Sequence, residues 1–506
     1  MRVLTDRVGG VPSQQPDPGD HRSVAVVGAG ITGLVAAYEL RRRGVDVTLY
    51  ESSAYAGGVI RTTHTDGFVA EHGPNSFVTS APVNALLTQL DLDDDVVEAN
   101  TSANKRFVVR AGRLESFPMS PPAMLSTGLF SLRAKLRVLL EPLVKRSAGD
   151  EDESIASFVR RRLGREVLDY AVDPFISGIF AGDPETLSMA HAFPRVHALE
   201  QQYGSISKGL MAQRRGKRGA SAPASASEAS GATPDAAFGA APGVAPGAAP
   251  DGRARLISFI DGMQTLPDAL AASLAGTLRL DCPVRLVHRN DTRWVVDAGP
   301  DGASRAHHVD AIIMATPAHA MAAMELPATL RHHGAPVEQV QYPPVSTITL
   351  GFRREDVTHP LDGFGMLIPS VERRSVLGAL FNSSLFPERA PDDHVAITCF
   401  IGGARHPARA REGTDALVER VMHDLRDLVG ARRDPMFVKH VFWPRAIPQY
   451  TVGYGAVKQA ADAMELANPG FYLAGNFRNG VSVGDCVASG QLIAERVAAY
   501  LARAGG

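Results

Sequence analysis

The chain has 506 residues and the ordinary apolar content of a globular protein, which is enough for two or three domains. Its formal net charge of −2 lacks the basic excess of nucleic-acid-binding proteins, so we expect no nucleic-acid partner. Cys282, Cys399 and Cys486 are too widely spaced for a metal motif or a disulfide framework. We therefore expect no metal site and a reducing, cytoplasmic location.

The first 21 residues are polar and contain several prolines and glycines. They lack the apolar stretch of a secretory signal, and we predict a disordered tail over residues 1–21. No apolar run of the sequence approaches the ~20 residues that span a bilayer.

Residues 23–51 have the pattern of a complete strand–helix–strand unit. A β-branched run at 23–27 leads into the motif G-A-G-I-T-G at 28–33, and a helical segment follows at 34–43. A second strand-like run at 45–50 ends in an acidic residue. This arrangement is the fingerprint of a dinucleotide-binding fold.

The glycines and the acid of this unit each have a physical role. Gly28 permits the tight turn after the strand, Gly30 lets the backbone approach a pyrophosphate, and Gly33 lets helix and strand pack closely. The phosphates bind the free N–H groups of the helix N-terminus. Glu51 is placed to accept hydrogen bonds from a ribose.

A second glycine pair follows the unit and favours a flavin over a nicotinamide. Gly57 and Gly58 allow the chain to fold back along the dinucleotide, and Arg61 is placed to bind phosphate. Proteins that bind soluble NAD do not usually have this G-G-x-x-R extension. The alternative is an ordinary glycine turn with a surface arginine.

Two segments with helical periodicity, at 131–144 and 154–170, predict a mainly helical subdomain over residues 101–212. The first segment carries leucines at helical spacing with basic residues between them, namely Leu132, Leu136, Leu139, Leu140, Arg133, Lys135 and Arg137. Such a helix packs on its own core or touches a membrane surface, and both interpretations are open.

An insertion rich in Ala, Pro, Gly and Ser occupies residues 213–254 and has almost no large apolar side chains. We predict that it is disordered. Strand patterns return after it, and we expect a substrate-binding domain with a mixed sheet at 326–454. The remaining segments, 22–100, 255–325 and 455–506, are predicted to form one FAD-binding domain.

The C-terminal segment repeats the sequence of strand, glycine turn and helix, with the helix predicted at about 487–502. In flavoproteins such a second helix N-terminus can face the flavin pyrimidine, where its dipole stabilises negative charge. A closing structural unit without a ligand is the alternative.

Taken together, these motifs resemble the oxygen-dependent protoporphyrinogen oxidases of the flavin amine-oxidase superfamily, in particular the plant mitochondrial branch. The matching blocks include GAGITG, ESSAYAGGVIRT, EHGPNSF, NKRFVVRAG, DPFISGIFAGDPETLSM, FIDGMQTL, LDGFGMLIPS, LGALFNSSLFPERAP, CFIGG and LAGNFRNGVSVGDCVASG. The resemblance implies an α/β fold, with a Rossmann-like FAD domain, a mixed-sheet substrate domain and a helical, membrane-associating subdomain.

The resemblance also implies site residues. One noncovalent FAD per chain would contact Gly28, Ala29, Gly30, Ile31, Thr32, Gly33, Glu51, Ser52, Gly58, Val59, Arg61, Gly73, Pro74, Asn75, Ser76, Val284, Asn476, Val481, Ser482 and Val483. The porphyrinogen would contact Arg106, Gly178, Leu367, Leu380 and Phe400. Arg106 would pair with a propionate, and Gly178 would leave room for the macrocycle. From the residues alone, an arginine such as Arg106 on a strand is more often solvated or structural, and Leu367, Leu380 and Phe400 would be core residues by default.

The implied reaction converts protoporphyrinogen IX to protoporphyrin IX in three two-electron steps, with O2 as acceptor and H2O2 as product. The flavin carries the chemistry, so no catalytic side chain is assigned, and His64, His72 and His319 are interpreted as structural. A homodimer and peripheral attachment to the inner face of the cytoplasmic membrane are further expectations.

Three other functions are open. Coproporphyrinogen III oxidation uses the same chemistry on a substrate with four carboxylates and requires a more positive pocket. An amine oxidase or carotenoid desaturase would share the scaffold, and Cys486 lies where covalent amine oxidases attach their flavin. The third is an FAD-binding scaffold without catalysis.

Overall fold

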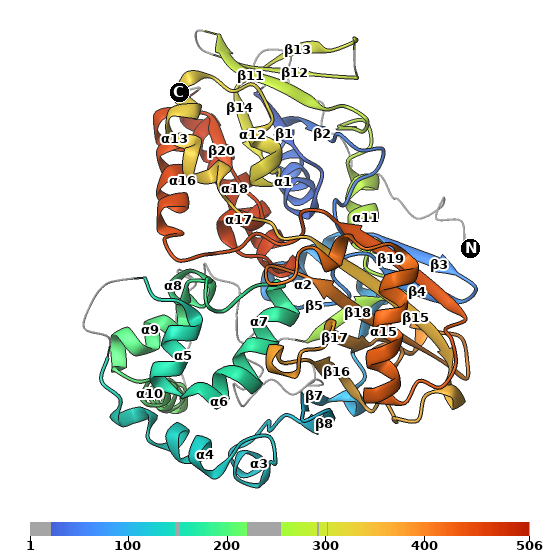
Figure 1. Ribbon diagram of the computed structural model, residues 1–506. Helices are drawn as coiled ribbons and strands as arrows, with labels where there is room; N and C mark the ends of the chain where they lie inside the picture. Colours follow the sequence, from blue (N-terminus) through green and yellow to red (C-terminus); the bar gives the residue numbers. More distant parts are fainter. Residues whose placement is uncertain (1–21, 147–151, 220–254, 291–292, 301, 505–506) are drawn as a thin grey trace.

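The computed structural model describes residues 22–146, 152–219, 255–290, 293–300 and 302–504. The predicted tail at 1–21 and most of the predicted insertion lie outside the described residues. Figure 1 shows a parallel sheet with its helices at the top, a large sheet at the lower right and a group of helices at the lower left.

Five parallel strands form the upper sheet, in the order β10–β2–β1–β14–β20. Their bounds are Leu278–Arg279 (β10), Asp46–Tyr50 (β2), Ser23–Val27 (β1), Ala311–Met314 (β14) and Phe471–Leu473 (β20). In β1, Val24 and Val26 pack in a core with α1 (Ile31–Arg42) and α18 (Val483–Ala504), while Val27 belongs to the core on the other face. Burial on both faces explains why this strand is apolar throughout.

An antiparallel sheet and several helices complete the upper region (Figure 1). The sheet consists of β11 (Val284–Asn290), β12 (Arg293–Ala298) and β13 (Arg305–Val309). The helices are α11 (Thr265–Ser273), α12 (Ala318–Ala322), α13 (Ala328–Glu338), α16 (Gly455–Ala467) and α17 (Asn476–Asn479). Segments far apart in sequence therefore build one region around the parallel sheet, and its helix α18 begins four residues earlier than predicted.

A seven-stranded mixed sheet forms the second region, in the order β19–β15–β18–β17–β16–β7–β8. The bounds are Phe437–Trp443 (β19), Val345–Arg353 (β15), His394–Gly402 (β18), Val376–Phe381 (β17), Gly363–Leu367 (β16), Lys105–Arg110 (β7) and Arg113–Ser116 (β8). Helix α15 (Thr414–Val429) covers one face. Residues 105–116, predicted as part of the helical subdomain, supply β7 and β8, because Phe107 and Val109 join the core beneath α15.

The third region is helical. Its elements are α3 (Pro121–Ser126), α4 (Leu132–Leu139), η3 (Glu141–Leu143), α5 (Ile155–Arg162), α6 (Arg165–Val167), η4 (Leu168–Val172), α7 (Asp173–Phe180), α8 (Met189–Ala192), α9 (Pro194–Tyr203) and α10 (Ile206–Gly219). Helix α10 thus extends into the predicted insertion. Arg162 is fully buried and ties the region together by donating to Glu141 at 2.8 Å and to Glu200 at 2.7 Å. Pairing compensates for burying the charges.

Smaller elements join these regions. They are β3 (Thr62–Thr65) with β4 (Phe68–Glu71), the sheet of β5 (Phe77–Val78), β9 (Leu256–Phe259) and β6 (Val96–Glu98), and the helices α2 (Ala81–Gln89) and α14 (Asn382–Leu385). None of the helices in the described ranges is both long enough and apolar enough to cross a membrane.

Candidate flavin and substrate site

The glycine motif forms a turn that only glycine permits. Gly28 has φ +100°, and its N–H donates to the Tyr50 carbonyl at 2.8 Å, so the turn is tied to the neighbouring strand. A Cβ at Gly33 would lie 1.9 Å from the Gly28 oxygen, which excludes every other residue there. A Cβ at Gly30 would meet no protein atom within 4 Å. The space above Gly30 is therefore open, as close approach of a pyrophosphate requires.

Glu51 follows β2 and is positioned by backbone donors. Its Oε2 accepts the N–H of Ala29 at 2.8 Å, and its Oε1 accepts the N–H of Ser53 at 2.9 Å and the hydroxyl of Ser52 at 3.2 Å. The Glu51 carboxylate thus stabilises the glycine turn, and it lies at the end of β2, the strand beside β1. This is where a ribose would bind next to a pyrophosphate on α1.

The second glycine pair lies directly against the first motif. The N–H of Gly57 donates to the Ala29 carbonyl at 2.8 Å, and a Cβ at Gly58 would lie 3.4 Å from the Gly30 Cα. Gly57 and Gly58 both have positive φ, at +102° and +60°. The predicted folding back of the chain at this pair is present in the structure.

Arg61, three residues after Gly58, has a buried donor. Its guanidinium stacks on the Tyr55 ring at 3.9 Å, and its Nε is buried with no hydrogen-bond partner among the described residues. A buried guanidinium nitrogen needs an acceptor, and a phosphate oxygen is a matching one. The residues present therefore fit a dinucleotide with a pyrophosphate.

The loop between β4 and β5 carries Gly73, Pro74, Asn75 and Ser76. A Cβ at Gly73 would lie 2.4 Å from the Val59 carbonyl oxygen, so the loop packs closely on the second glycine segment. The buried Asn75 accepts a hydrogen bond from the Asn382 amide at 2.6 Å. This bond joins the predicted flavin-binding loop to the end of strand β17 in the large sheet.

Thr316 is a candidate that the sequence did not indicate. It lies just beyond β14, its Cγ2 would be 3.0 Å from a Cβ at Gly28, and its buried Oγ1 has no partner among the described residues. Ligands of parallel sheets bind at the carboxyl ends of the strands. That rule could have found Thr316, had the pairing of β14 with β1 been known.

The C-terminal helix begins beside α1. A Cβ at Gly490 would lie 2.7 Å from the Thr32 oxygen, so α18 packs closely on α1. Ser482 and Asp485 form a capping box: the Ser482 hydroxyl accepts the Asp485 N–H at 3.0 Å, and the Asp485 carboxylate accepts the Ser482 N–H at 3.2 Å. Val481 and Val483 flank this cap.

Other predicted contacts are held by bonds within the protein. The carbonyl of Asn476, the first residue of α17, accepts the hydroxyl of Tyr450. Val284 begins β11 two residues after Cys282, whose N–H donates to the Glu51 carbonyl at 2.8 Å. Burial raises the pKa of the Cys486 thiol to about 12, so this cysteine is a protonated core residue at neutral pH.

The predicted substrate residues converge on one face of the seven-stranded sheet. The register aligns Arg106 with Gly365 and Leu380 in one row, and Leu367 with Gly378 and Phe400 in the next. Their strand neighbours point to the opposite face, into the core beneath α15. Leu367, Leu380 and Phe400 are half-buried, and they form an apolar surface on this face.

Helix α7 lies over this surface. A Cβ at Gly178 would lie 2.5 Å from Leu367 Cδ2, so the absence of a side chain at Gly178 makes room for Leu367 in this structure. The close approach of helix and sheet at this point limits the depth of the site.

Arg106 lies at the edge of the same face without an acidic partner among the described residues. Its guanidinium is 5.4 Å from the centre of the Phe364 ring, and its Nη1 is 3.9 Å from the Met119 sulfur. Burial lowers the pKa of Arg106 from its ordinary value, but a guanidinium stays charged at neutral pH. A partly buried cation beside apolar side chains is stabilised by an anion, and a ligand carboxylate would be a matching one.

Two of the three histidines named above have hydrogen-bond partners, whereas the buried Nδ1 of His319 has none among the described residues. His64 Nε2 lies 3.1 Å from the Asp261 carbonyl, and His72 Nε2 lies 2.7 Å from the Thr63 hydroxyl. Burial, with the nearby Lys439 and Arg61, lowers the pKa of His72 to about 4. His319 packs edge-on against Tyr342. No cluster of metal-ligating side chains occurs in the part of the chain that the structure describes.

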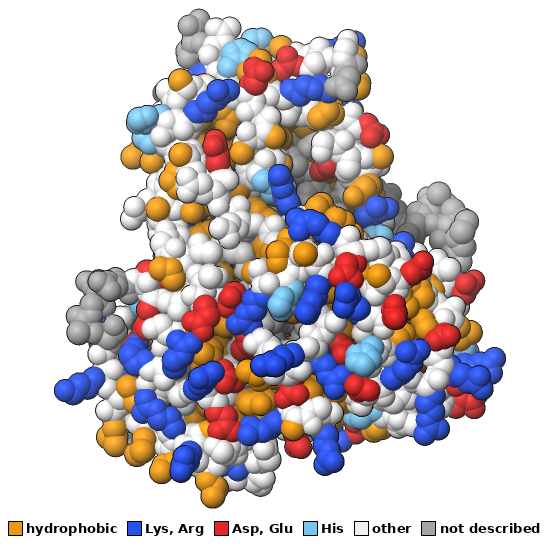
Figure 2. Space-filling view, in the orientation of Figure 1, with side chains coloured by type: hydrophobic (Ala, Val, Ile, Leu, Met, Phe, Trp, Pro, Cys, Tyr) orange, Lys and Arg blue, Asp and Glu red, His pale blue; other side chains and the backbone are white. Residues whose placement is uncertain are grey.

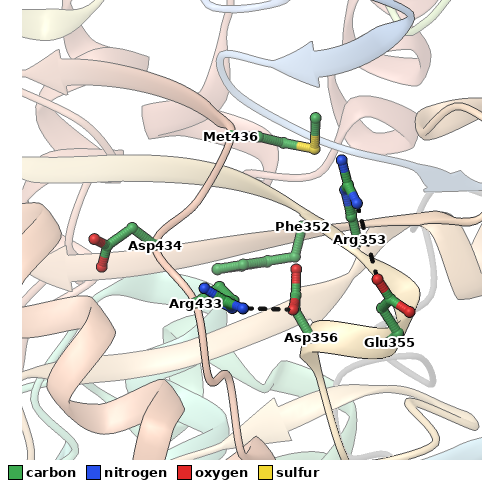
Figure 3. A pocket seen from close by; sticks show the side chains of 7 residues that line it. All are labelled: Phe352, Arg353, Glu355, Asp356, Arg433, Asp434 and Met436. Carbon is green, nitrogen blue, oxygen red and sulfur yellow. Dashed lines mark ion pairs between the residues drawn. The ribbon is translucent and has the colours of Figure 1, made fainter.

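A separate surface hollow of about 410 Å³ lies at the end of β15. Figure 3 shows that charged side chains dominate its lining, with ion pairs between Arg433 and Asp356 and between Arg353 and Glu355. Its two arginines are paired with Asp356 and Glu355, and its third acid, Asp434, is paired with Arg426. The hollow does not belong to the site described above.

Comparisons with known proteins found a matching family model and similar sequences. The family model described as flavin-containing amine oxidoreductase matches residues 31–498. Protoporphyrinogen oxidase 2, chloroplastic/mitochondrial, of Arabidopsis thaliana is 35% identical over 515 residues, which cover 97% of this chain and 97% of that protein. Coproporphyrinogen III oxidase of Bacillus subtilis (strain 168) is 26% identical, with 95% and 98% covered.

A solved structure has the same fold. The crystal structure of a protein provisionally assigned as a protoporphyrinogen oxidase, from Exiguobacterium sp. 255-15, superposes with a TM-score of 0.75. The two sequences are 24% identical, and the match covers 94% of this chain and 99% of the other.

Proposed function

The chain belongs to the family of flavin-containing amine oxidoreductases, and from this premise we propose that it oxidises protoporphyrinogen IX to protoporphyrin IX in haem biosynthesis. The reaction removes six electrons in three two-electron steps, with three O2 reduced to three H2O2. The cofactor is one noncovalent FAD.

The observation that carries this proposal is the position of Arg106. It is a partly buried cation at the edge of an apolar sheet face, and it has no acidic partner among the described residues. A flat, apolar macrocycle with carboxylates at its rim matches this arrangement, because its faces bind the apolar surface while a carboxylate pairs with the guanidinium.

The protein contributes binding and orientation. The glycine motif, Arg61 and the N-terminus of α1 would hold the FAD pyrophosphate, and Glu51 would bind the ribose. FAD, when bound, supplies the hydride acceptor for the reaction. Leu367, Leu380, Phe400 and helix α7 would orient the macrocycle and exclude water from it.

Oxidation of coproporphyrinogen III is the second candidate, because the Bacillus subtilis relative has that name. Its substrate carries four carboxylates and needs further cations on the same face. Arg110 is the next basic residue on that face of β7, and its Nη1 donates to Glu166 at 2.8 Å. Its charge is already neutralised, which favours the substrate with two carboxylates.

The test is an assay of the purified protein with both porphyrinogens side by side. Porphyrin fluorescence and peroxide would be followed, and anaerobic bleaching of the flavin would be measured by absorbance. We expect faster turnover per enzyme with protoporphyrinogen IX. Preference for coproporphyrinogen III would replace the first candidate by the second, and no flavin bleaching with either would refute both.

We also propose peripheral membrane attachment, which the exposed leucines of the helical region support. The exposed leucines there are Leu125, Leu132, Leu136, Leu139, Leu140 and Leu143, and Leu132 is 82% exposed. Of the residues of α4, Ala134 alone is buried, so this helix does not bury its leucines on its own core. Figure 2 shows hydrophobic side chains beside Lys and Arg at the lower end of the molecule, where α3 and α4 lie in Figure 1.

An apolar strip beside basic residues fits an anionic lipid surface such as the inner face of the cytoplasmic membrane. Sedimentation with phosphatidylglycerol vesicles tests this. We expect binding by the wild type and its loss on combining Leu132→Ser with Leu139→Ser. The control is Leu466→Ser, which changes a leucine of α16 that is equally exposed. Equal binding by all three proteins would contradict the attachment.

A further inference from the structure

Both ends of helix α7 are tied to one turn of the large sheet. Arg405, in the turn after β18, donates through Nη1 to Asp173, the first residue of α7. Through Nη2 it donates to Asp183 at 2.9 Å, just beyond the end of the helix. One guanidinium therefore bridges carboxylates from the two ends of the helix that covers the substrate face.

The surrounding backbone reinforces this bridge. Asp173 also accepts the N–H of Ser370 at 2.8 Å, from the segment that follows β16. The Ala404 N–H donates to the Ala181 carbonyl at 2.8 Å, and Ala181 has φ +47°, which turns the chain back toward Arg405. These contacts fix α7 to the two strands, β16 and β18, that carry Leu367 and Phe400.

The position of α7 matters because Gly178, in the middle of the helix, contacts Leu367. A shift of the helix would change the space above the apolar surface. Arg405 itself is engaged by two carboxylates, so it acts through α7 and not on the substrate. A π-helical turn, η4, precedes the helix, and such turns often occur next to functional sites.

We infer that Arg405 is a positioning residue, which holds α7 at the separation from the sheet that a flat tetrapyrrole requires. This inference rests on the proposed function. Loss of the bridge should weaken substrate binding while the flavin site, which lies at the glycine motifs, stays intact.

The chain offers a matched control on the opposite face of the same sheet. Arg374 also bridges two carboxylates, donating to Asp424 at 3.3 Å and to Asp427 at 2.7 Å on helix α15. Its side chain is 18% exposed, and that of Arg405 is 22% exposed. Arg374→Met and Arg405→Met thus remove comparable bridges, but only the second bridge touches α7.

The experiment compares the holoenzymes of wild type, Arg405→Met, Arg405→Lys and Arg374→Met. Thermal unfolding, FAD per chain, and KM and kcat for protoporphyrinogen IX are measured, together with hydrogen exchange of a peptide covering residues 173–180. We expect Arg405→Met to raise KM at least five-fold, with kcat and FAD content within two-fold of wild type. Its α7 peptide should exchange faster, and Arg405→Lys should recover part of the KM. Arg374→Met should change neither KM nor this exchange.

An unchanged KM in folded, FAD-loaded Arg405→Met would refute the positioning role, as would an equal rise in Arg374→Met. If Arg405→Met does not fold, Asp183→Asn, which removes the charge of one of the two carboxylates, is judged by the same criteria. Absence of turnover in the wild type would refute the proposed function and this inference with it. Wild-type turnover with an unchanged KM in the variant refutes the inference alone.

Discussion

Replacing Arg106 by alanine tests the substrate site most directly. Its guanidinium is partly buried, and no described residue provides a carboxylate for it, so we expect the pairing to come from the ligand. A charge-assisted hydrogen bond to a partly buried guanidinium contributes about 2–3 kcal/mol. At about 1.4 kcal/mol per tenfold change, Arg106→Ala should raise KM for protoporphyrinogen IX by about 30- to 150-fold.

The maximal rate should change little, because the carboxylate lies at the rim of the macrocycle and its bond is the same before and during oxidation. Porphyrin fluorescence gives KM and kcat, and flavin absorbance gives FAD per chain, which we expect to equal that of wild type. The control is Lys105→Ala. Lys105 is the preceding residue on β7, points to the other face and pairs with Asp362 at the surface.

A substrate with esterified carboxylates tests whether Arg106 binds a carboxylate. If Arg106 binds a carboxylate, the dimethyl ester of protoporphyrinogen IX should bind wild type and Arg106→Ala equally weakly, because the partner of the guanidinium is already lost. Equal KM values for the free acid in wild type and a flavin-loaded Arg106→Ala would refute the assignment. A similar loss in Lys105→Ala would show that net charge, rather than a specific contact, is responsible.

Three further predictions concern the flavin and stability. Gly30→Val should fold normally but lose FAD, since a Cβ at this position meets no protein atom within 4 Å. The control is Gly413→Val, at a helix N-cap with the same backbone conformation and equal space, which should keep its FAD. Flavin absorbance and thermal unfolding are measured, and a yellow Gly30→Val would contradict the phosphate site. Acid precipitation should release the flavin into the supernatant, because Cys486 is a buried thiol, and flavin retained in the pellet would indicate a covalent bond. His359 Nδ1 accepts the Leu361 N–H at 3.0 Å, and burial lowers the pKa of His359 in the folded state. As the pH falls, the unfolded chain therefore takes up this proton at a higher pH than the folded chain does. The free energy of unfolding should fall as the pH drops below about 6.5, the ordinary pKa of histidine. His359→Asn should therefore lose less stability than wild type between pH 7 and 5 in urea unfolding, and identical acid profiles would contradict this role.

The flavin motifs could be predicted because their determinants are local. The turn at Gly28, the close contact at Gly33 and the capping of α18 by Ser482 each depend on residues within a few positions of one another. The sequence did not indicate Thr316, because its approach to Gly28 depends on the pairing of β14 with β1 across almost 300 residues. Strand pairing at that separation leaves no local pattern.

The candidate substrate site required both the resemblance to a known family and the strand register of the structure. Arg106, Leu367, Leu380 and Phe400 were assigned by resemblance, and the strand register then aligned them on one face. That β7 joins this sheet, and not the helical subdomain, follows from the burial of alternate side chains against α15.

By itself, the sequence determined the glycine turn at residues 28–33 and predicted that a flavin dinucleotide binds there, because glycine spacing and a following acid specify that turn chemically. The tertiary structure alone decided that Arg106 has no acidic partner among the described residues, and that α7 is held by Arg405 over an apolar sheet face. Which charges are neutralised, and which stay available to a ligand, depends on contacts between distant segments. Those contacts form only when the chain is folded.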